Sequence, residues 1–321
     1  MHYCHKKMST YADYCRRLFG RPMQKLTIDA GFSCPNRVGT VGTEGCAFCN
    51  NEAFSPSYCH PEKSITQQLD EGILFHAHRH RKEVGFLAYF QSYSNTYAPL
   101  PVLRKYYEEA LAHPKVSGVV IGTRPDCVDA EKLDYLAALA KRHYVMVEYG
   151  IESCYDRTLA AVRRGHDYTC TATAIEATAG RGIACGGHLI LGLPGESREE
   201  MVAEAGLLSR LPLTTLKLHQ LQVLKGSQMG RDYLSRSGCL PPPFELSEYV
   251  GLVCDFLERL RPDIVIERFA ASVPPTMQVD PSRGWRHADG TAVKGSELPR
   301  LIRSELSRRG TWQGINYGGN R

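Results

Sequence analysis

The chain contains the stretch SGVVIGT at residues 117–123, and its apolar, β-branched centre is typical of a strand buried on both faces of a sheet. A helical pattern of apolar residues covers 130–142, and the apolar run YVMVEYG follows it at 144–150. Two buried strands joined by a helix are expected to lie parallel, with a right-handed crossover. This part of the sequence therefore predicts an α/β fold.

The same strand–helix unit repeats along most of the chain. No GxGxxG motif follows the first strand, so we expect a partial (β/α)6 barrel rather than a dinucleotide-binding sheet. Functional side chains of such a barrel are expected at the carboxyl ends of its strands. The predicted strands are 24–30, 85–91, 117–123, 144–150, 185–191 and 214–223, and the predicted helices are 64–82, 100–113, 130–142, 156–162, 171–181 and 198–210.

The sequence changes character where GCLPPP, at 238–243, combines several residues that break regular structure. We expect residues 1–237 to form the barrel core with an N-terminal lead-in. Residues 238–321 are expected to form an α+β extension that packs on this core and closes the substrate side. The extension is predicted to contain a helix at 244–260, a strand at 263–269 and a short helix at 297–308.

Composition is that of an ordinary globular protein. Of the 321 residues, 43% are hydrophobic and 23% are charged, and the net charge is +5. This mildly basic balance permits an RNA partner without requiring one. No stretch resembles the ~18 apolar residues of a membrane span. The opening residues, MHYCHKK, lack the apolar core of a secretory signal, so we expect a cytoplasmic protein without a membrane partner.

Twelve cysteines in a chain expected in the cytoplasm point to metal or redox chemistry rather than to disulfides. Three of them, Cys34, Cys46 and Cys49, have the spacing C-x11-C-x2-C, and the last two share one tight turn. Three thiolates are one fewer than a closed zinc or iron–sulfur site uses, which leaves one position open. The alternatives are a zinc knuckle completed by Cys59 or His60, and buried thiols without a metal.

These cysteines and their surroundings resemble the radical S-adenosylmethionine (SAM) enzymes, in which an aromatic residue, here Phe48, typically stands between the last two cysteines. The usual spacing has three residues between the first two cysteines, and the eleven found here occur in a subset. The stretches GFSCPNR, GCAFCN and YFQSYSNTYAP closely resemble YhcC/YtqA-type radical SAM proteins, over nearly the whole chain.

A more distant resemblance is to the radical SAM domain of the elongator catalytic subunit, which modifies wobble uridines in tRNA. It rests on TRPD at 123–126, GIES at 150–153, RGH at 164–166 and the stretch 188–195. The acetyltransferase half of that subunit has no counterpart in these residues, so acetyl-CoA-dependent chemistry is not expected.

The resemblance implies two cofactors. A [4Fe–4S] cluster would be bound by Cys34, Cys46 and Cys49, and its open iron would be chelated by the amino and carboxylate groups of SAM. One electron, from a donor such as flavodoxin or ferredoxin, would cleave SAM to methionine and a 5′-deoxyadenosyl radical that takes a hydrogen atom from substrate. A water-poor barrel interior suits such a reaction.

The resemblance also suggests which residues hold SAM. Radical SAM enzymes usually grip the amino group with a Gly-Gly-Glu-like turn after the second strand, where this chain instead offers Gln91 and Ser92. Radical SAM coproporphyrinogen dehydrogenases hold the ribose and the carboxylate with two residues twelve positions apart, matched here by Glu152 and Arg164. An arginine suits a carboxylate because its fork binds two oxygens. For each residue the alternative is an ordinary structural or surface role.

Further cofactor contacts are expected from the fifth strand and the turn after it. His188 stands where related enzymes place a polar contact, although a lone histidine in an apolar strand is often a core residue. Gly192 and Leu193 begin a turn whose backbone meets adenine in the family. The same turn is also predicted to open a helix through a capping box formed by Ser197 and Glu200.

Lys217 and His219 are the candidate catalytic residues, because alternation on the sixth strand would aim both inward toward substrate, where the lysine could bind an anion. Lys25 has a similar position on the first strand. The basic run HAHRHRK at 76–82 is either a solvated helix end or part of an RNA-facing patch. The resemblance alone suggests tRNA as the partner and wobble-uridine modification as the function. The alternatives are the same radical chemistry on a small metabolite or a protein, and a non-catalytic, zinc-stabilised RNA-binding module.

Overall fold

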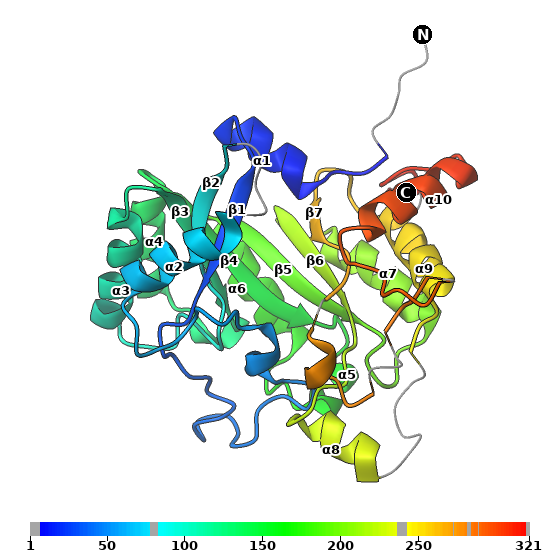
Figure 1. Cartoon of the computed structure of the whole chain (residues 1–321), viewed down its shortest axis with the longest axis horizontal. Coiled ribbons are helices and arrows are strands. Elements are labelled where there is room, and N and C mark those ends of the chain that lie inside the picture. The colour runs from blue at the N-terminus through cyan, green and yellow to red at the C-terminus, as the bar shows by residue number, and fades with distance from the viewer. Residues whose placement is uncertain are drawn as a thin grey trace.

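A computed structural model describes residues 7–77, 83–235, 243–271, 273–280, 284–287 and 289–318. The strands of this part of the chain form one parallel sheet, in which each strand pairs with the next one along the sequence (Figure 1). This confirms the predicted α/β class. The strands are β1 (Met23–Ile28), β2 (Gly85–Phe90), β3 (Val116–Thr123), β4 (Tyr144–Glu152), β5 (Ala184–Leu191), β6 (Thr215–Gln220) and β7 (Val265–Arg268).

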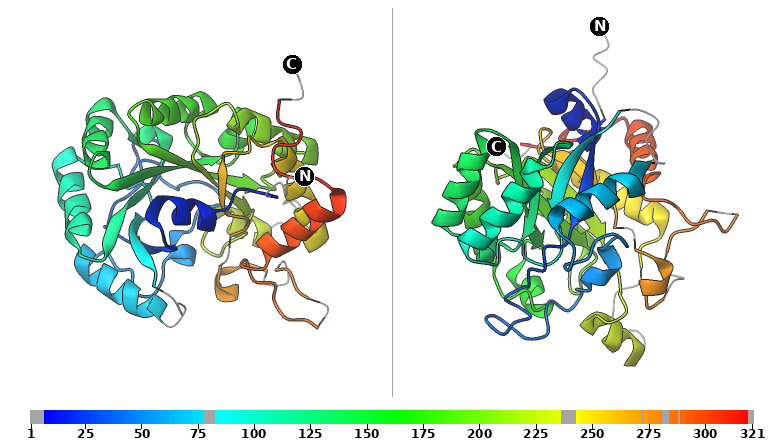
Figure 2. Two further views of the ribbon diagram at one scale, coloured as in Figure 1. Left: turned by 90° about the horizontal axis from the view of Figure 1, so that it is seen from above. Right: turned by 60° about the vertical axis from the view of Figure 1, so that its left-hand side comes forward.

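The sheet curls into a partial barrel whose first and last strands do not pair. Seen from above, its strands follow an arc (Figure 2, left). The curl brings Lys25 of β1 to Glu267 of β7, with 2.6 Å between the ammonium and a carboxylate oxygen. Side chains from opposite ends of the sheet therefore meet inside it, and the predicted partial barrel is confirmed.

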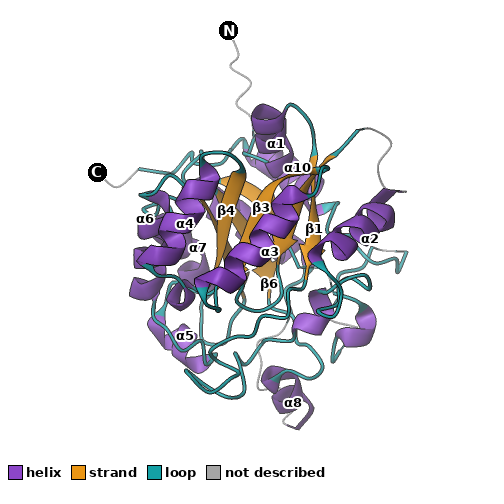
Figure 3. Ribbon diagram, turned by 90° about the vertical axis from the view of Figure 1, so that its left-hand side faces the viewer, coloured by secondary structure: helices purple, strands orange, loops and turns teal. Residues whose placement is uncertain are grey.

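Helices cover the outer side of the arc (Figures 2 and 3) because each crossover returns the chain to the start of the next parallel strand. Apolar side chains of the helices and of the outer strand faces form the main hydrophobic core. The helices are α1 (Tyr11–Phe19), α2 (Ile65–Ala77), α3 (Leu100–Ala112), α4 (Ala130–Ala140), α5 (Asp156–Ala161), α6 (Tyr168–Ala179), α7 (Arg198–Leu208), α8 (Gln228–Ser235), α9 (Leu246–Arg259) and α10 (Leu298–Arg309).

Two of these helices, α1 and α8, were not predicted, although α1 carries the expected boundary residues. Thr10 accepts a hydrogen bond at its start, and Gly20 ends it in the left-handed conformation. The predicted capping box at Ser197 and Glu200 is present at the start of α7. Most of the basic run at 76–82 lies outside the described residues. No helix in the described ranges has both the length and the apolar character needed to cross a membrane.

The C-terminal extension adds to the barrel sheet as well as packing on it. Its strand, β7, pairs with β6 and continues the sheet as a seventh strand, where the sequence predicted six barrel strands. Helix α9 packs against α7, and α10 packs against α9. The predicted boundary between core and extension falls within 236–242, outside the described residues.

Candidate active site

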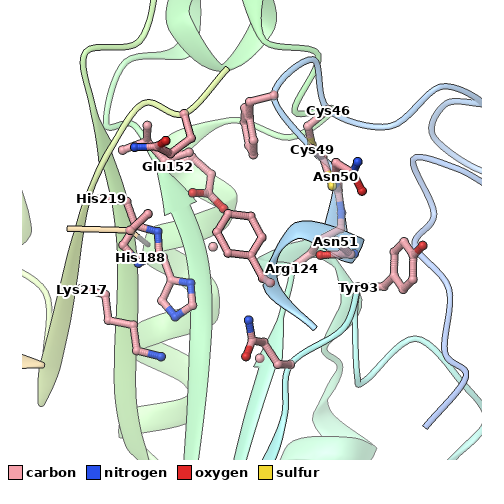
Figure 4. A pocket seen from close by; sticks show the side chains of 18 of the residues that line it. Cys46, Cys49, Asn50, Asn51, Tyr93, Arg124, Glu152, His188, Lys217 and His219 are labelled. Carbon is pink, nitrogen blue, oxygen red and sulfur yellow. The ribbon is translucent and has the colours of Figure 1, made fainter. Parts of the chain in front are cut away.

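A cavity lies among the carboxyl ends of the strands, beside the loop that carries the cysteines. Figure 4 shows Lys217, His188 and His219 on one side of it, with Cys46 and Cys49 across from them. The sequence-predicted residues that line it are Cys34, Cys46, Cys49, Gln91, Glu152, Arg164, His188, Lys217 and His219, whereas Ser92, Gly192 and Leu193 do not. The whole lining comes from the strands β2 to β7, from the cysteine loop and from other loops, so the strand ends are brought together as the barrel predicts.

Three backbone hydrogen bonds hold the turn between Cys46 and Cys49. It is closed by a hydrogen bond from the Cys49 N–H to the Cys46 carbonyl oxygen, 3.0 Å long. Between them, the Ala47 N–H donates to the carbonyl oxygen of Val162, and the Ala47 carbonyl accepts from the N–H of Met229, each at 2.9 Å. The turn is therefore fixed by the ends of α5 and α8 as well as by its own backbone.

The longer arm of the loop is fixed by Asn36. Its side-chain amide donates to the carbonyl oxygen of Arg163 at 2.6 Å and lies 3.5 Å from the sulfur of Cys46. Gly42 approaches so closely that a Cβ there would overlap the Asn36 amide oxygen. The glycine at this position is thus required by close packing, which allows the loop to fold back over the eleven residues between Cys34 and Cys46.

The electrostatics of the thiols favour a positively charged ligand. Burial, and then the neighbouring charge of Cys46, raise the pKa of the Cys49 thiol to about 11. The charge of Cys34 also raises the pKa of Cys49, whereas the guanidinium of Arg37 lowers it. Because like charges repel, three thiolates can be held here together only when a cation neutralises them.

The three cysteines line the cavity without converging on one point. In the part of the chain that the structure describes, no three histidine, cysteine or acidic side chains converge as ligands of one metal ion. An iron–sulfur cube instead binds each cysteine at a different iron, so its ligands surround a volume. The side chain of Cys59 donates to the carbonyl oxygen of Thr27 at 2.9 Å, and neither it nor His60 lines the cavity.

Glu152 and Arg164 come together above the end of β4. Nη2 of Arg164 donates to the Gly150 carbonyl oxygen at 2.7 Å and lies 3.6 Å from a Glu152 carboxylate oxygen. Nη1 lies 3.5 Å from the sulfur of Cys46, while Nε is buried without a partner. Glu152 has φ +67°, a strained value for a non-glycine residue. A Cβ on Gly150 would overlap the carboxylate and lie 2.5 Å from Nη2, so this packing requires glycine.

Arg124 lines the cavity, although the sequence predicted no role for it. Its side chain is buried, and Nε and Nη2 donate to Asp126 at 2.8 and 2.7 Å. Nη1 is buried and has no hydrogen-bond partner among the described residues, which is costly for a charged group. The TRPD motif was the available signal, but its arginine and aspartate could equally have formed a surface ion pair.

Glu148 and Lys217 line the cavity, and Lys25 and Glu267 contact them from behind its wall. We call these four charged side chains the floor network. Lys217 donates to Glu148 at 2.6 Å, to Glu267 at 3.2 Å and to the Tyr89 hydroxyl at 3.1 Å. Lys25 contacts both carboxylates. Burial alone would raise the pKa of Glu148, but Lys217 and Lys25 hold it well below its usual range.

Glu148, Glu267 and the Tyr89 hydroxyl together use all three N–H donors of Lys217. A substrate anion could therefore reach this ammonium only by displacing a present partner, and the predicted anion-binding role stays a prediction. Glu148 was missed because its neighbours in VMVEYG are apolar, so the sequence presents it only as part of a buried strand.

The two histidines differ in their environments. Nε2 of His188 lies 3.1 Å from a Glu148 carboxylate oxygen, so the imidazole is anchored to the floor network. The ring of His219 lies 5.7 Å from that of His188, and its Nε2 is buried without a partner. Burial, and then the charges of His188 and Arg268, lower the pKa of His219 well below its usual range. His219 is therefore neutral near pH 7.

The remaining predicted cofactor residues lie at or behind the cavity wall. The amide oxygen of Gln91 accepts from the Thr27 hydroxyl at 3.3 Å, and Ser92 is buried. Gly192 has φ +89° and packs against Phe244. Leu193 belongs to an apolar cluster with Ala47, so it supports the cysteine turn from behind.

Comparisons with known proteins agree with this arrangement. The family model described as the radical SAM superfamily matches residues 36–208, which is more than half of the chain. The model of the radical SAM C-terminal domain matches residues 213–292. The matched ranges include Cys46 and Cys49, Arg164 and Lys217.

Relatives extend over the whole chain. YtqA of Bacillus subtilis is 36% identical over 311 residues, covering 96% of this chain and 92% of YtqA. YhcC of Escherichia coli K12 is 34% identical over 306 residues, covering 92% of this chain and 96% of YhcC. The tRNA uridine(34) acetyltransferase of Methanocaldococcus infernus is 25% identical over 194 residues, covering 59% of this chain and 33% of that protein.

Solved structures with similar folds include Elp3 and SuiB. Archaeal Elp3 of Methanocaldococcus infernus, truncated at its N-terminus, aligns with a TM-score of 0.65 and 14% identity. That alignment covers 91% of this chain and 64% of the Elp3 chain. SuiB of Streptococcus suis aligns with a TM-score of 0.50 and 12% identity, covering 78% of this chain and 50% of SuiB. At these identities the likeness concerns the fold alone.

Proposed function

The chain belongs to the radical SAM superfamily, and from this premise we propose that it modifies the wobble uridine of tRNA. It is thus a radical SAM enzyme, and the family uses a [4Fe–4S] cluster and SAM. The resemblance to YhcC/YtqA-type proteins predicted from the motifs is confirmed by the relatives.

In the proposed site, Cys34, Cys46 and Cys49 would hold the cluster, since all three line one cavity and their thiolates would repel one another without a cation. When bound, the cluster supplies the electron that cleaves SAM and thereby generates the 5′-deoxyadenosyl radical. Asn36 and Arg164, each 3.5 Å from the Cys46 sulfur, donate toward it and stabilise its negative charge. We propose that flavodoxin or ferredoxin supplies the electron. We also propose that the protein is located in the cytoplasm, where such a donor is found.

The chain's own residues orient SAM. Glu152 and Arg164 lie together beside the cysteines, where they would bind the ribose hydroxyls and the carboxylate of SAM. The unpartnered Nη1 of Arg124, facing the same cavity, is a second donor for an anionic group there. Gln91 offers an amide at the end of β2 for the amino group.

Two observations support an RNA substrate. The relative from Methanocaldococcus infernus, aligned over 194 residues, is named for chemistry on uridine 34 of tRNA. The charge of the cavity suits a polyanion. Of the described side chains that line it, the cations are Arg37, Arg124, Arg164, Lys217 and Arg268, and the carboxylates are Glu148 and Glu152.

The observation that carries the proposal is the joint placement of three cysteines and this cationic lining around one cavity. Reduced, cluster-loaded protein is expected to convert SAM to 5′-deoxyadenosine, and Cys49→Ala is expected to abolish the conversion. Mass spectrometry of tRNA nucleosides from a deletion strain then tests the substrate. Loss of a wobble-uridine nucleoside, restored by the wild-type gene and not by Cys49→Ala, is the expected result. An unchanged nucleoside profile would reject tRNA and leave a small molecule or a protein as substrate.

A further inference from the structure

A second cavity adjoins the first on the side of the C-terminal extension (the outer cavity). The two share Gln220, Leu221, Gln222 and Ala271 in their walls. The shared wall is fixed, because the side chain of Gln220 donates to the Ala271 carbonyl oxygen at 3.2 Å and accepts from its N–H at 2.9 Å. A substrate with one group in the inner cavity therefore has its next group within reach of the outer one.

The outer cavity contains a fixed aromatic ring, Trp285. Its indole N–H donates to the Phe244 carbonyl oxygen at 2.7 Å, and its ring packs on the buried Tyr249 with 4.8 Å between ring centroids. Tyr249 is itself fixed through a 2.6 Å hydrogen bond to Phe269. An indole fixed from behind and partly exposed to a cavity is a stacking surface that loses little conformational entropy when a flat ligand binds.

Two amide side chains in the same cavity present a hydrogen-bonding edge. The amide nitrogen of Gln278 donates to the amide oxygen of Gln222 at 3.0 Å. Within the described residues, no further hydrogen bond is made by the Gln222 amide nitrogen or the Gln278 amide oxygen. The Gln222 amide nitrogen, a donor, and the Gln278 amide oxygen, an acceptor, thus remain in this cavity for a ligand. This is the pattern that a nucleobase offers along its Watson–Crick edge.

Cations complete the cavity. Arg286 and Lys294 are exposed and line it, and neither forms an ion pair among the described residues. The arginine is oriented by one 2.9 Å hydrogen bond from its guanidinium to the Gly290 carbonyl oxygen. Exposed cations next to a stacking ring and an amide edge are the combination that binds a nucleotide through its phosphate, its base plane and its base edge.

We propose that the outer cavity binds a nucleotide of single-stranded RNA next to the nucleotide that reacts in the inner cavity. This inference rests on the proposed function and gives the extension a role, since residues that follow β7 line most of the outer cavity, while Gln220 at the end of β6 and the residues after it line the rest (Figure 1, orange and yellow-green). Sequence-specific recognition of RNA commonly uses unstacked loop bases in this way.

The test is equilibrium binding of a labelled anticodon stem–loop RNA to cluster-loaded protein in the presence of SAM. Trp285→Ala is expected to weaken binding about tenfold to a hundredfold, the range for losing one stacked base. Trp285→Phe keeps a ring and is expected to retain most of the affinity. Lys294→Glu is expected to reduce the slope of log affinity against log salt by roughly 0.7 to 1. Arg303→Glu, an exposed charge on α10 outside both cavities, is the matched control and should change the slope less.

Fluorescence gives a readout independent of affinity. The chain has two tryptophans, so a Trp312→Phe variant reports on Trp285 alone. Stacking of an RNA base is expected to quench this fluorescence. Uridine monophosphate at the same concentration should quench far less. Equal quenching would mean that the outer cavity binds a free nucleotide rather than RNA.

The outcomes also separate this inference from the proposed function. If Trp285→Ala and Lys294→Glu bind RNA like the Arg303→Glu control while the deletion strain lacks a wobble nucleoside, the outer cavity is not a nucleotide site but the tRNA function stands. If wild-type protein binds no anticodon RNA and the nucleoside profile is unchanged, both proposals are rejected.

Discussion

The ammonium of Lys217 on β6 lies 2.6 Å from a carboxylate oxygen of Glu148 on β4, and both side chains are almost completely buried. β5 separates these strands in the sheet, so the pair reaches across a neighbouring strand. Removing one member of a buried ion pair leaves the other uncompensated. The pair therefore ties the inner end of the cavity to the stability of the fold.

Lys217→Met is expected to lower the free energy of unfolding by about 3–5 kcal/mol, because Glu148 keeps only Lys25 and His188 as partners. Urea unfolding under anaerobic conditions measures the change. The double variant with Glu148→Gln should lose less than the sum of the single losses. Lys115→Met, at an exposed position, is the control and should stay within about 0.5 kcal/mol of wild type. Additive losses would contradict a coupled pair.

Iron content distinguishes the cysteine loop from the zinc-knuckle alternative. Wild-type protein is expected to bind about four irons per chain, and Cys49→Ala to lose most of them, since two thiols cannot retain a cube. Cys59→Ala is the matched control, because its thiol donates to Thr27 outside the cavity. Metal analysis and visible absorbance check both variants. If Cys59→Ala lost its metal as Cys49→Ala does, a fourth thiol ligand would have to be accepted.

Gly150→Ala tests the placement of Glu152 and Arg164 without removing either charge. The added Cβ would overlap the carboxylate and crowd the guanidinium, so the affinity for SAM is expected to fall at least about tenfold, or 1.4 kcal/mol. Gly206→Ala in α7 meets no atom within 4 Å and should leave SAM affinity unchanged while adding about 0.5–1 kcal/mol of stability. Equilibrium dialysis with SAM measures the affinities. If Gly150→Ala bound SAM with normal affinity, Glu152 and Arg164 would not belong to the SAM site.

His166 predicts a pH dependence of stability. Burial, and then the neighbouring guanidinium of Arg164, lower the pKa of His166 from 6.5 to about 4. Between these values the unfolded chain binds a proton that the folded chain does not, so this contribution is complete above pH 6.5 and is lost as the pH falls toward 4. His166→Gln should lose less stability than wild type between pH 7 and pH 5, as measured by urea unfolding at both. Equal losses would mean that His166 titrates normally in the folded protein.

Local sequence patterns predicted a structural element correctly where a short segment had a clear pattern, such as an apolar run or a close pair of cysteines. The run at 117–123 became β3, and the spacing of Cys46 and Cys49 became the expected turn. The separation of twelve residues between Glu152 and Arg164 also brought them together, because α5 between them is short. By contrast, α1 and α8 were missed, since a short amphipathic helix carries few residues of signal.

The sequence by itself determined the parallel order of the strands, the tight cysteine turn and the family, because each of these depends on residues close together along the chain or on motifs read in order. The tertiary structure alone decided that Lys25 and Glu267, from the first and last strands, contact each other and the cavity-lining pair Glu148 and Lys217. It also decided that residues of the extension line the outer cavity, beside the first cavity. The reason is physical: the curl of a sheet sums small twists over all its strands, so contacts across it follow from the whole fold rather than from any one segment.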